Sequence, residues 1–107
     1  MLTRARLKEK VKPFVRRIRG VAQIHRMAII YLLAHDAMEV HEIVGHLGLG
    51  ESLVSHHLRQ MHLTGWLLKV RIGRSITYRL NEKAFLEFNR LLEDTPYYRD
   101  VLSRHVK

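Results

Sequence analysis

The feature that most constrains the fold is a pair of short amphipathic segments separated by a glycine turn. The first segment spans residues 40–47 and the second spans residues 51–64, with Gly48-Leu49-Gly50 between them. Each segment repeats its apolar residues at helical spacing, which predicts a helix with one buried face. The residues expected on these two faces are Val40, Ile43, Val44 and Leu47, then Val54, Leu58 and Met61. Gly65 is expected to end the second helix.

Directly after Gly65 the apolar period changes to two, which predicts a β-hairpin. Its tip is the basic, glycine-containing stretch Ile72-Gly73-Arg74-Ser75. Trp66 and the tyrosines are expected to face the core. In the first strand, Trp66, Leu68 and Val70 alternate with Leu67, Lys69 and Arg71. In the second strand, Ile76, Tyr78 and Leu80 alternate with Thr77 and Arg79. Two helices, a tight turn and a hairpin predict a mainly α fold with a small β-hairpin wing, the winged helix-turn-helix.

Further helices are expected on both sides of this unit. Residues 7–18 have helical spacing, and their helix either begins at Pro13 or is kinked there. Residues 23–34 are so uniformly apolar that they are expected to lie in the core, and residues 35–38 are expected to form a turn. After the hairpin, Asn81 is expected to cap one helix and Thr95-Pro96 to open a last one. The last helix would carry Tyr97, Tyr98, Val101, Leu102, His105 and Val106.

The positive charge of the chain is concentrated in two blocks. The net charge of the 107 residues is +9: residues 1–20 contribute +7 and residues 51–80 contribute +4, whereas residues 21–50 contribute −2 and residues 81–107 are neutral. A balance this basic favours a polyanionic partner, nucleic acid first and an anionic membrane second. A solvated helix face is the alternative for residues 1–20. The length predicts one domain, with its core in residues 21–80 and C-terminal helices in residues 81–107.

Several stretches resemble the ArsR/SmtB family of bacterial repressors. They are Arg26-Met27-Ala28-Ile29-Ile30-Tyr31-Leu32-Leu33, Ile43-Val44-Gly45-His46-Leu47-Gly48-Leu49, Val54-Ser55-His56-His57-Leu58-Arg59, Gly73-Arg74 and Tyr78-Arg79-Leu80. The resemblance implies a homodimer that binds double-stranded DNA. The chain departs from the family pattern at Gly50, where a Ser cap is common, and at His56, where Arg is common. It has no cysteine, and the segment after the wing (residues 82–94) has no histidine, so metal sensing is not implied.

The predicted DNA contacts lie on the second helix of the pair and on the wing. Outward positions opposite the apolar stripe should contact bases or phosphates, with Arg59 able to bond guanine at two atoms. The alternative for both regions is a solvated surface. The predicted contact residues are Ser52, Ser55, His56 and Arg59 on the helix, and Lys69, Arg71, Arg74 and Ser75 on the wing. His57 is expected to be a packing histidine, and Arg16 and Arg17 are weaker candidates for phosphate contact.

Other functional classes find little support in the sequence. Glu42 and His46 share a helix face, but zinc needs about four converging ligands, and His35, His41 and His105 have no companion at ligand spacing. We therefore predict no metal site and no cofactor. No catalytic motif is present, so an enzyme is not expected. No apolar run is long enough to span a membrane, and no signal peptide is expected, which fits a cytoplasmic protein.

We expect a homodimer, because the chain offers more apolar surface near its two ends than a monomer of this size easily covers. The residues that predict it are Phe14, Ile18, Phe88, Leu92, Tyr98 and Leu102. The leading functional prediction is a dimeric, sequence-specific repressor. Two alternatives remain open: a protein-interaction module on a winged-helix scaffold, and a module that binds nucleic acid without sequence preference. The sequence does not indicate an effector.

Overall fold

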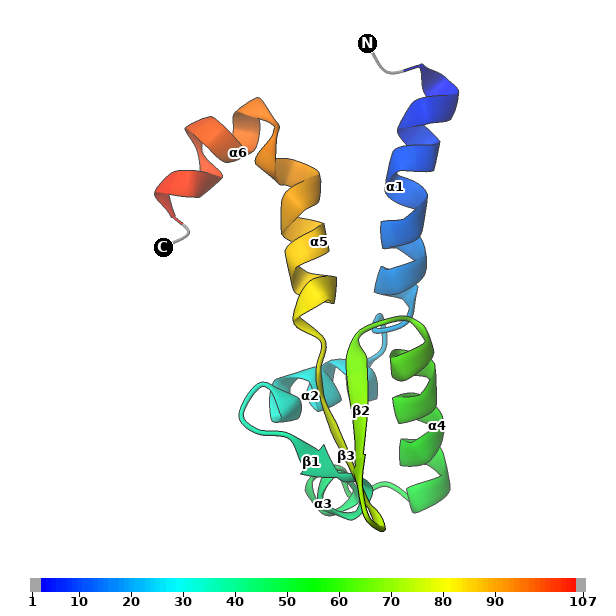
Figure 1. Cartoon of the computed structure of the whole chain (residues 1–107). Coiled ribbons are helices and arrows are strands. Elements are labelled where there is room, and N and C mark those ends of the chain that lie inside the picture. Colours follow the sequence, from blue (N-terminus) through cyan, green and yellow to red (C-terminus); the bar gives the residue numbers. More distant parts are fainter. Residues whose placement is uncertain (1–2, 106–107) are drawn as a thin grey trace.

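The computed structural model describes residues 3–105, so Val106 of the predicted last helix lies outside the described residues. Figure 1 shows the order and arrangement of the elements. The helices and strands are α1 (Arg4–Arg19), α2 (Ile24–Leu33), β1 (Met38–Glu39), α3 (Val40–Leu47), α4 (Glu51–Leu63), β2 (Leu67–Ile72), β3 (Ser75–Leu80), α5 (Glu82–Glu93), α6 (Pro96–Asp100) and the 3-10 turn η1 (Leu102–Arg104). This is the predicted winged helix-turn-helix.

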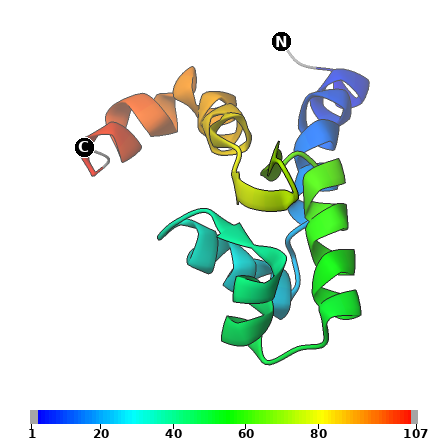
Figure 2. The same cartoon turned by 60° about the horizontal axis from the view of Figure 1, so that its bottom comes forward.

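The core lies where α2, α3 and α4 pack against the sheet. The predicted stripe of α4 is fully buried, and so is Ile43 of α3. Three further α3 residues, Val40, Val44 and Leu47, pack at the edge of this core. The helical periodicity therefore identified the inner faces of both helices correctly. Figure 2 shows the tight turn, residues 48–50, that joins α3 to α4.

The sheet has three antiparallel strands in the order β1-β3-β2. β2 and β3 form the predicted hairpin, with Ile72 opposite Ser75 and a two-residue turn in which Gly73 has φ +61°. β1 corrects a prediction, since Met38 was placed in a turn but is buried and pairs with Tyr78. A two-residue strand has no periodicity of its own, and its partner lies forty residues away.

The hairpin places its apolar residues differently on its two faces. Residues opposite each other in an antiparallel pair point to the same face. Leu67 lies opposite Leu80 and is buried together with Tyr78. Leu68 and Val70 belong to the other face, where Val70 is exposed. Trp66, just before β2, is buried as predicted. The prediction was wrong for Tyr31 and Tyr97, which are 70% and 59% exposed.

Helix α2 is buried on one side only, which corrects the prediction of a core helix. Ile29 and Leu33 are buried, whereas Ile24 is 77% exposed. Met27 and Tyr31 lie on the same exposed side. An apolar composition on all sides shows that a helix can be buried, but neighbouring elements decide which sides are covered.

Two helices project from the core as arms. Figure 1 shows α1 and α5 rising beside each other from one end of the molecule. The radius of gyration is 16.6 Å, against about 13 Å for a compact domain of this length. Helix α1 begins at Arg4 and contains Pro13, so the helix does not begin at the proline. The predicted last helix is shorter than expected, because α6 ends at Asp100 and η1 follows.

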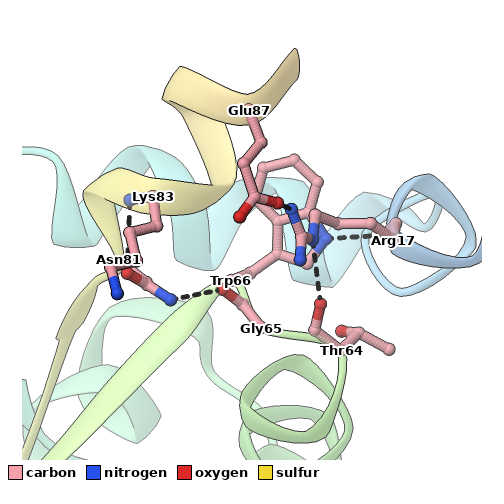
Figure 3. A network of polar contacts seen from close by, with 7 residues as sticks. All are labelled: Arg17, Thr64, Gly65, Trp66, Asn81, Lys83 and Glu87. Carbon is pink, nitrogen blue, oxygen red and sulfur yellow. Dashed lines mark hydrogen bonds and ion pairs between the residues drawn. The ribbon is translucent and has the colours of Figure 1, made fainter. Parts of the chain in front are cut away.

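A polar network fixes the arms to the winged core (Figure 3). The Asn81 side chain donates to the carbonyl of Gly65 at 2.9 Å and also caps α5. The indole nitrogen of Trp66 donates to the carbonyl of Arg17. The guanidinium of Arg17 donates to the carbonyl of Thr64 at 3.3 Å and pairs with Glu87 on α5. α1, α5 and the turn after α4 are thereby held at one joint.

Candidate nucleic-acid interface

Helix α4 presents a polar outer face beside its buried stripe. Gly50 is the N-cap and supplies no side-chain hydrogen bond to the helix. Ser52, His56 and Arg59 are exposed, and Ser55 is half-buried. These are the four positions that the helical spacing predicted to point outward. The backbone amides of the first turn are also left without a capping side chain, which leaves them able to bond an anion.

The wing extends this polar face with positive charge. Lys69 lies opposite Tyr78 in the strand register, and Arg71 lies opposite Ile76. Both cations therefore lie on the same face of the hairpin as Tyr78. All four predicted wing residues are exposed, with Arg74 and Ser75 at the tip.

Helix α4 packs beside β2, the first strand of the wing. Burial raises the pKa of the Tyr78 hydroxyl, and the nearby positive charge of Arg59 opposes that rise. Figure 1 shows the N-terminal end of α4 and the hairpin tip at the same end of the molecule.

The cations of this surface are not neutralised within the protein. Among residues 3–105, none of the ion pairs involves Arg59, Lys69 or the two wing arginines, Arg71 and Arg74. The other cation of β3, Arg79, pairs with Glu82 at 3.2 Å. The surface of α4 and the wing is thus suited to bind a polyanion that supplies the missing negative charge.

His57 is a packing histidine, as predicted. It is 6% exposed, and its Nδ1 accepts a hydrogen bond of 3.0 Å from Nε of Arg26. Burial lowers the pKa of His57, and the charge of Arg26 lowers it further. The imidazole is therefore held neutral, which allows Nδ1 to accept. In the sequence, Arg26 stood out only as part of the motif that resembles the ArsR/SmtB family. No local pattern connects it with His57, which lies thirty-one positions away.

The two arginines of α1 proposed as weaker phosphate contacts have different environments. Arg17 is engaged by Glu87 and by Thr64 at the joint, so it acts as a structural residue. Arg16 is exposed. Helix α1 rises from the end of the molecule opposite the hairpin tip (Figure 1). Neither arginine is therefore grouped with the cations of the wing.

A metal site would need several histidine or acidic side chains gathered in one place. Within residues 3–105, no group of three or more histidine or acidic side chains is arranged to hold a metal ion. Glu42, one half of the suggested pair with His46, instead accepts a bond from the backbone of Glu39 in a capping box at the start of α3. None of the helices in that range is long and apolar enough to cross a membrane.

Comparison with known proteins agrees with this geometry. Residues 25–65 match the model of the arsR family of bacterial regulatory proteins. Over 63 residues, the chain is 36% identical to the HTH-type transcriptional repressor SmtB of Mycobacterium tuberculosis. The chain is ArsR/SmtB-like. The similar stretch is 59% of this ArsR/SmtB-like chain and 47% of the repressor, so the chain spans about half the length of the curated relative it matches.

Solved structures show the same fold. A homodimeric winged helix-turn-helix DNA-binding domain from Mycobacterium bovis, described as a possible ArsR-family regulator, is similar over all of this chain and 94% of its own, with a TM-score of 0.68 and 21% identity. The transcriptional repressor BigR from Xylella fastidiosa covers 94% of this chain and 97% of its own, with a TM-score of 0.65 and 20% identity. At these identities the likeness establishes the fold of the ArsR/SmtB-like chain and not its ligand.

Proposed function

We propose that this chain is a sequence-specific DNA-binding transcriptional regulator that acts as a homodimeric repressor. The observation that carries the proposal is the set of unneutralised cations shared by α4 and the wing. A helix of this size fits the major groove of B-DNA, and a basic hairpin beside it can follow the adjacent backbone. The similar proteins are described as repressors and as a DNA-binding domain, which supports the same function.

The two parts of the surface have different roles in this proposal. Arg59 lies one turn after Ser55 on the outer face of α4 and reads a base, ideally guanine through its two acceptor atoms. His56 assists with a single hydrogen bond. Lys69, Arg71 and Arg74 neutralise phosphates and fix the position of the protein on the duplex.

The arms make the homodimer. The aromatic rings of Phe14 and Phe88 lie 6.3 Å apart between α1 and α5, yet Phe88 remains 44% exposed. Exposed apolar side chains continue along α1, α5 and α6, and a second copy with the same surface would cover them. They are Leu7, Ile18, Phe85, Leu86, Phe88, Tyr97 and Val101. The similar domain from Mycobacterium bovis is described as homodimeric.

The test compares Arg59→Ala with Arg74→Ala. A preferred duplex is first selected from random sequence, and each variant is then titrated on that duplex and on a random duplex at several salt concentrations. Arg59→Ala should cost about 1–3 kcal/mol on the preferred duplex and much less on the random one. Arg74→Ala should weaken both equally and reduce the log–log salt slope by about one unit.

Two other outcomes would redirect the proposal. If both variants weaken the two duplexes equally, α4 does not read bases and the protein binds nucleic acid without sequence preference. If neither duplex binds in a salt-dependent way, the winged helix is a protein-interaction module. A regulator of DNA works beside the chromosome, so we place the protein in the cytoplasm and assign it no enzymatic activity.

A further inference from the structure

A groove of about 660 Å³ lies between α1 and the C-terminal end of α4. One wall is a single side of α1, formed by Lys8, Val11, Lys12, Val15, Arg16 and Arg19. Opposite this wall lie Gly20, Arg26, Gln60 and Thr64. The volume is within the range of about 300–1,000 Å³ that is typical of small-molecule sites. Its residues from the end of α4, Gln60 and Thr64, are not among the predicted DNA contacts, so the groove is distinct from the surface proposed to bind DNA.

The lining of the groove combines positive charge with apolar surface. Five of its ten residues are lysine or arginine, and none of the ten is acidic. Val11 and Val15 contribute exposed apolar surface between the cations. Of the five cations, Lys12 alone takes part in an ion pair among the described residues, with Glu9 at 3.0 Å. An anion in the groove would relieve the mutual repulsion of these charges.

Arg26 distinguishes this groove from a merely solvated basic helix. Its guanidinium is partly buried, with Nε bonded to His57 and Nη1 bonded to the carbonyl of Gly20 at 3.2 Å. A guanidinium has five N–H donors, and within residues 3–105 these two hydrogen bonds are those its side chain makes. Both acceptors are uncharged, and no ion pair among the described residues includes Arg26. The remaining donors can bind a carboxylate at two oxygens.

We propose that this groove binds a small organic anion, a carboxylate carried on an apolar chain. The carboxylate pairs with Arg26 and is flanked by Arg16 and Arg19, and the chain lies along Val11 and Val15. The apolar lining disfavours a bare inorganic anion, which would gain nothing from it. The groove lies at the C-terminal end of α4, whereas the hairpin tip lies toward the other end of that helix (Figure 1).

Ligand binding at this place has a direct route to α4. Arg26 is bonded to His57, which is buried on α4 between the neighbouring residues His56 and Leu58. A carboxylate on the remaining donors of Arg26 changes the charge that His57 experiences through the shared guanidinium. Binding of the anion and binding of DNA should therefore influence one another reciprocally. The coupling between anion binding and DNA binding rests on the proposed function, whereas the ligand site itself does not.

The experiment uses decanoate as the probe, titrated calorimetrically into the full chain without DNA. Decanol has the same chain without the charge, and acetate has the charge without the chain. Decanoate should bind saturably, with one molecule per protomer and at least tenfold more tightly than either control. Equal binding of decanoate and decanol, or no binding of decanoate, would overturn the proposal.

Charge-reversal variants of α1 test whether decanoate binds in the groove. The double variant Arg16→Glu, Arg19→Glu should weaken decanoate binding at least tenfold, and both positions are exposed, so folding should persist. The matched control Arg6→Glu, Lys10→Glu changes the same helix by the same charge outside the groove, and should alter binding less than twofold. Equal weakening by the two double variants would mean that decanoate responds only to net charge, which also overturns the site.

Two further measurements test whether a second copy of the chain or duplex DNA, and not a small anion, occupies the groove. If the groove variant leaves decanoate binding unchanged but shifts the dimer equilibrium in sedimentation, a second copy covers the groove and the proposal fails. If it weakens binding to duplex DNA as much as Arg74→Ala does while decanoate has no effect, the groove contacts DNA and the proposal also fails. With the site established, saturating decanoate should change the duplex affinity of the original protein at least threefold and that of the groove variant less than twofold.

Discussion

The two basic regions of this protein, the α1 arm and the surface of α4 with the wing, carry the same kind of charge in opposite surroundings. On α4 and the wing the cations lie on exposed polar surface, and none of Arg59, Lys69 or Arg74 is paired within the described residues. On α1 the cations alternate with exposed apolar residues, and Arg17 is bound to the carbonyl of Thr64 and to Glu87. Charge alone therefore does not define a binding surface, and its apolar and acidic neighbours decide its use.

The largest expected effect distinguishes an exposed apolar residue of the α1 arm from an exposed apolar residue of the wing. Ile18→Glu on α1 should raise the dimer dissociation constant at least a hundredfold, about 2.7 kcal/mol, because a two-fold interface would bury the new carboxylate twice. Ile72→Glu at the wing is the control, since Ile72 is 75% exposed and lies outside the arms. Sedimentation equilibrium of both variants measures the difference. Similar dimer dissociation constants for the two variants would show that the α1 arm does not form the dimer interface.

The next effect tests the joint between the arm and the core. A methyl group at Gly20 would lie 2.3 Å from Oγ1 of Thr64, so Gly20→Ala should destabilise the fold by about 1–3 kcal/mol. Gly45→Ala, in α3, meets nothing within 4 Å and should instead stabilise by about 0.5–1 kcal/mol. Urea denaturation measures both values.

A compensating variant locates the cause of the Gly20 effect. Thr64→Gly removes the whole side chain that the new methyl group meets. In the double variant Gly20→Ala, Thr64→Gly, the cost of the alanine should be smaller than in the original background. An undiminished cost would show that the joint is not closely packed at this contact.

A smaller effect separates the two neighbouring arginines of α1. Arg17→Met should cost about 1 kcal/mol of stability, because it removes the hydrogen bond to Thr64 and the partner of Glu87. Arg16→Met, one position earlier and exposed, should stay within about 0.5 kcal/mol of the original protein. Denaturation at pH 7 compares them.

The same pair gives a pH dependence with a defined sign. The hydrogen bond and charge of Arg17 lower the pKa of Glu87, so this stabilisation is present above the ordinary carboxyl range and is lost as pH falls through the lowered pKa. The difference between Arg17→Met and the original protein should therefore shrink in acid. A difference that is constant from pH 7 to pH 3 would exclude the ion pair as its cause.

The smallest effect concerns His57, which links α2 to α4. Burial lowers its pKa below the ordinary value of 6.5, so the unfolded chain binds the proton more readily than the folded protein does. Stability should fall as pH decreases from 6.5 through the lowered pKa. His57→Gln retains an acceptor for Arg26 but does not titrate, so its denaturation midpoint should fall less between pH 7.5 and pH 5.5. An equal fall in both proteins would assign the pH dependence to other groups.

The sequence by itself determined the fold class and the inner faces of its elements. Val54, Leu58 and Met61 recur at helical spacing, and all three are fully buried. A helix places every third or fourth residue on the same face, so one packed face buries them together. The hairpin followed from alternation and from Gly73, whose positive φ few other residues tolerate. His57 was placed correctly because it lies next to the buried stripe.

Only the tertiary structure decided the features that join distant parts of the chain. The burial of Met38 depends on its pairing with Tyr78, and the exposure of Ile24 depends on the absence of a covering element within the described residues. The role of Arg17 depends on Glu87, seventy residues away, and that of Arg26 on His57. Periodicity reports the local geometry of one element, whereas a contact between elements depends on how the whole chain packs, so residues with the same charge on one helix acquire different roles.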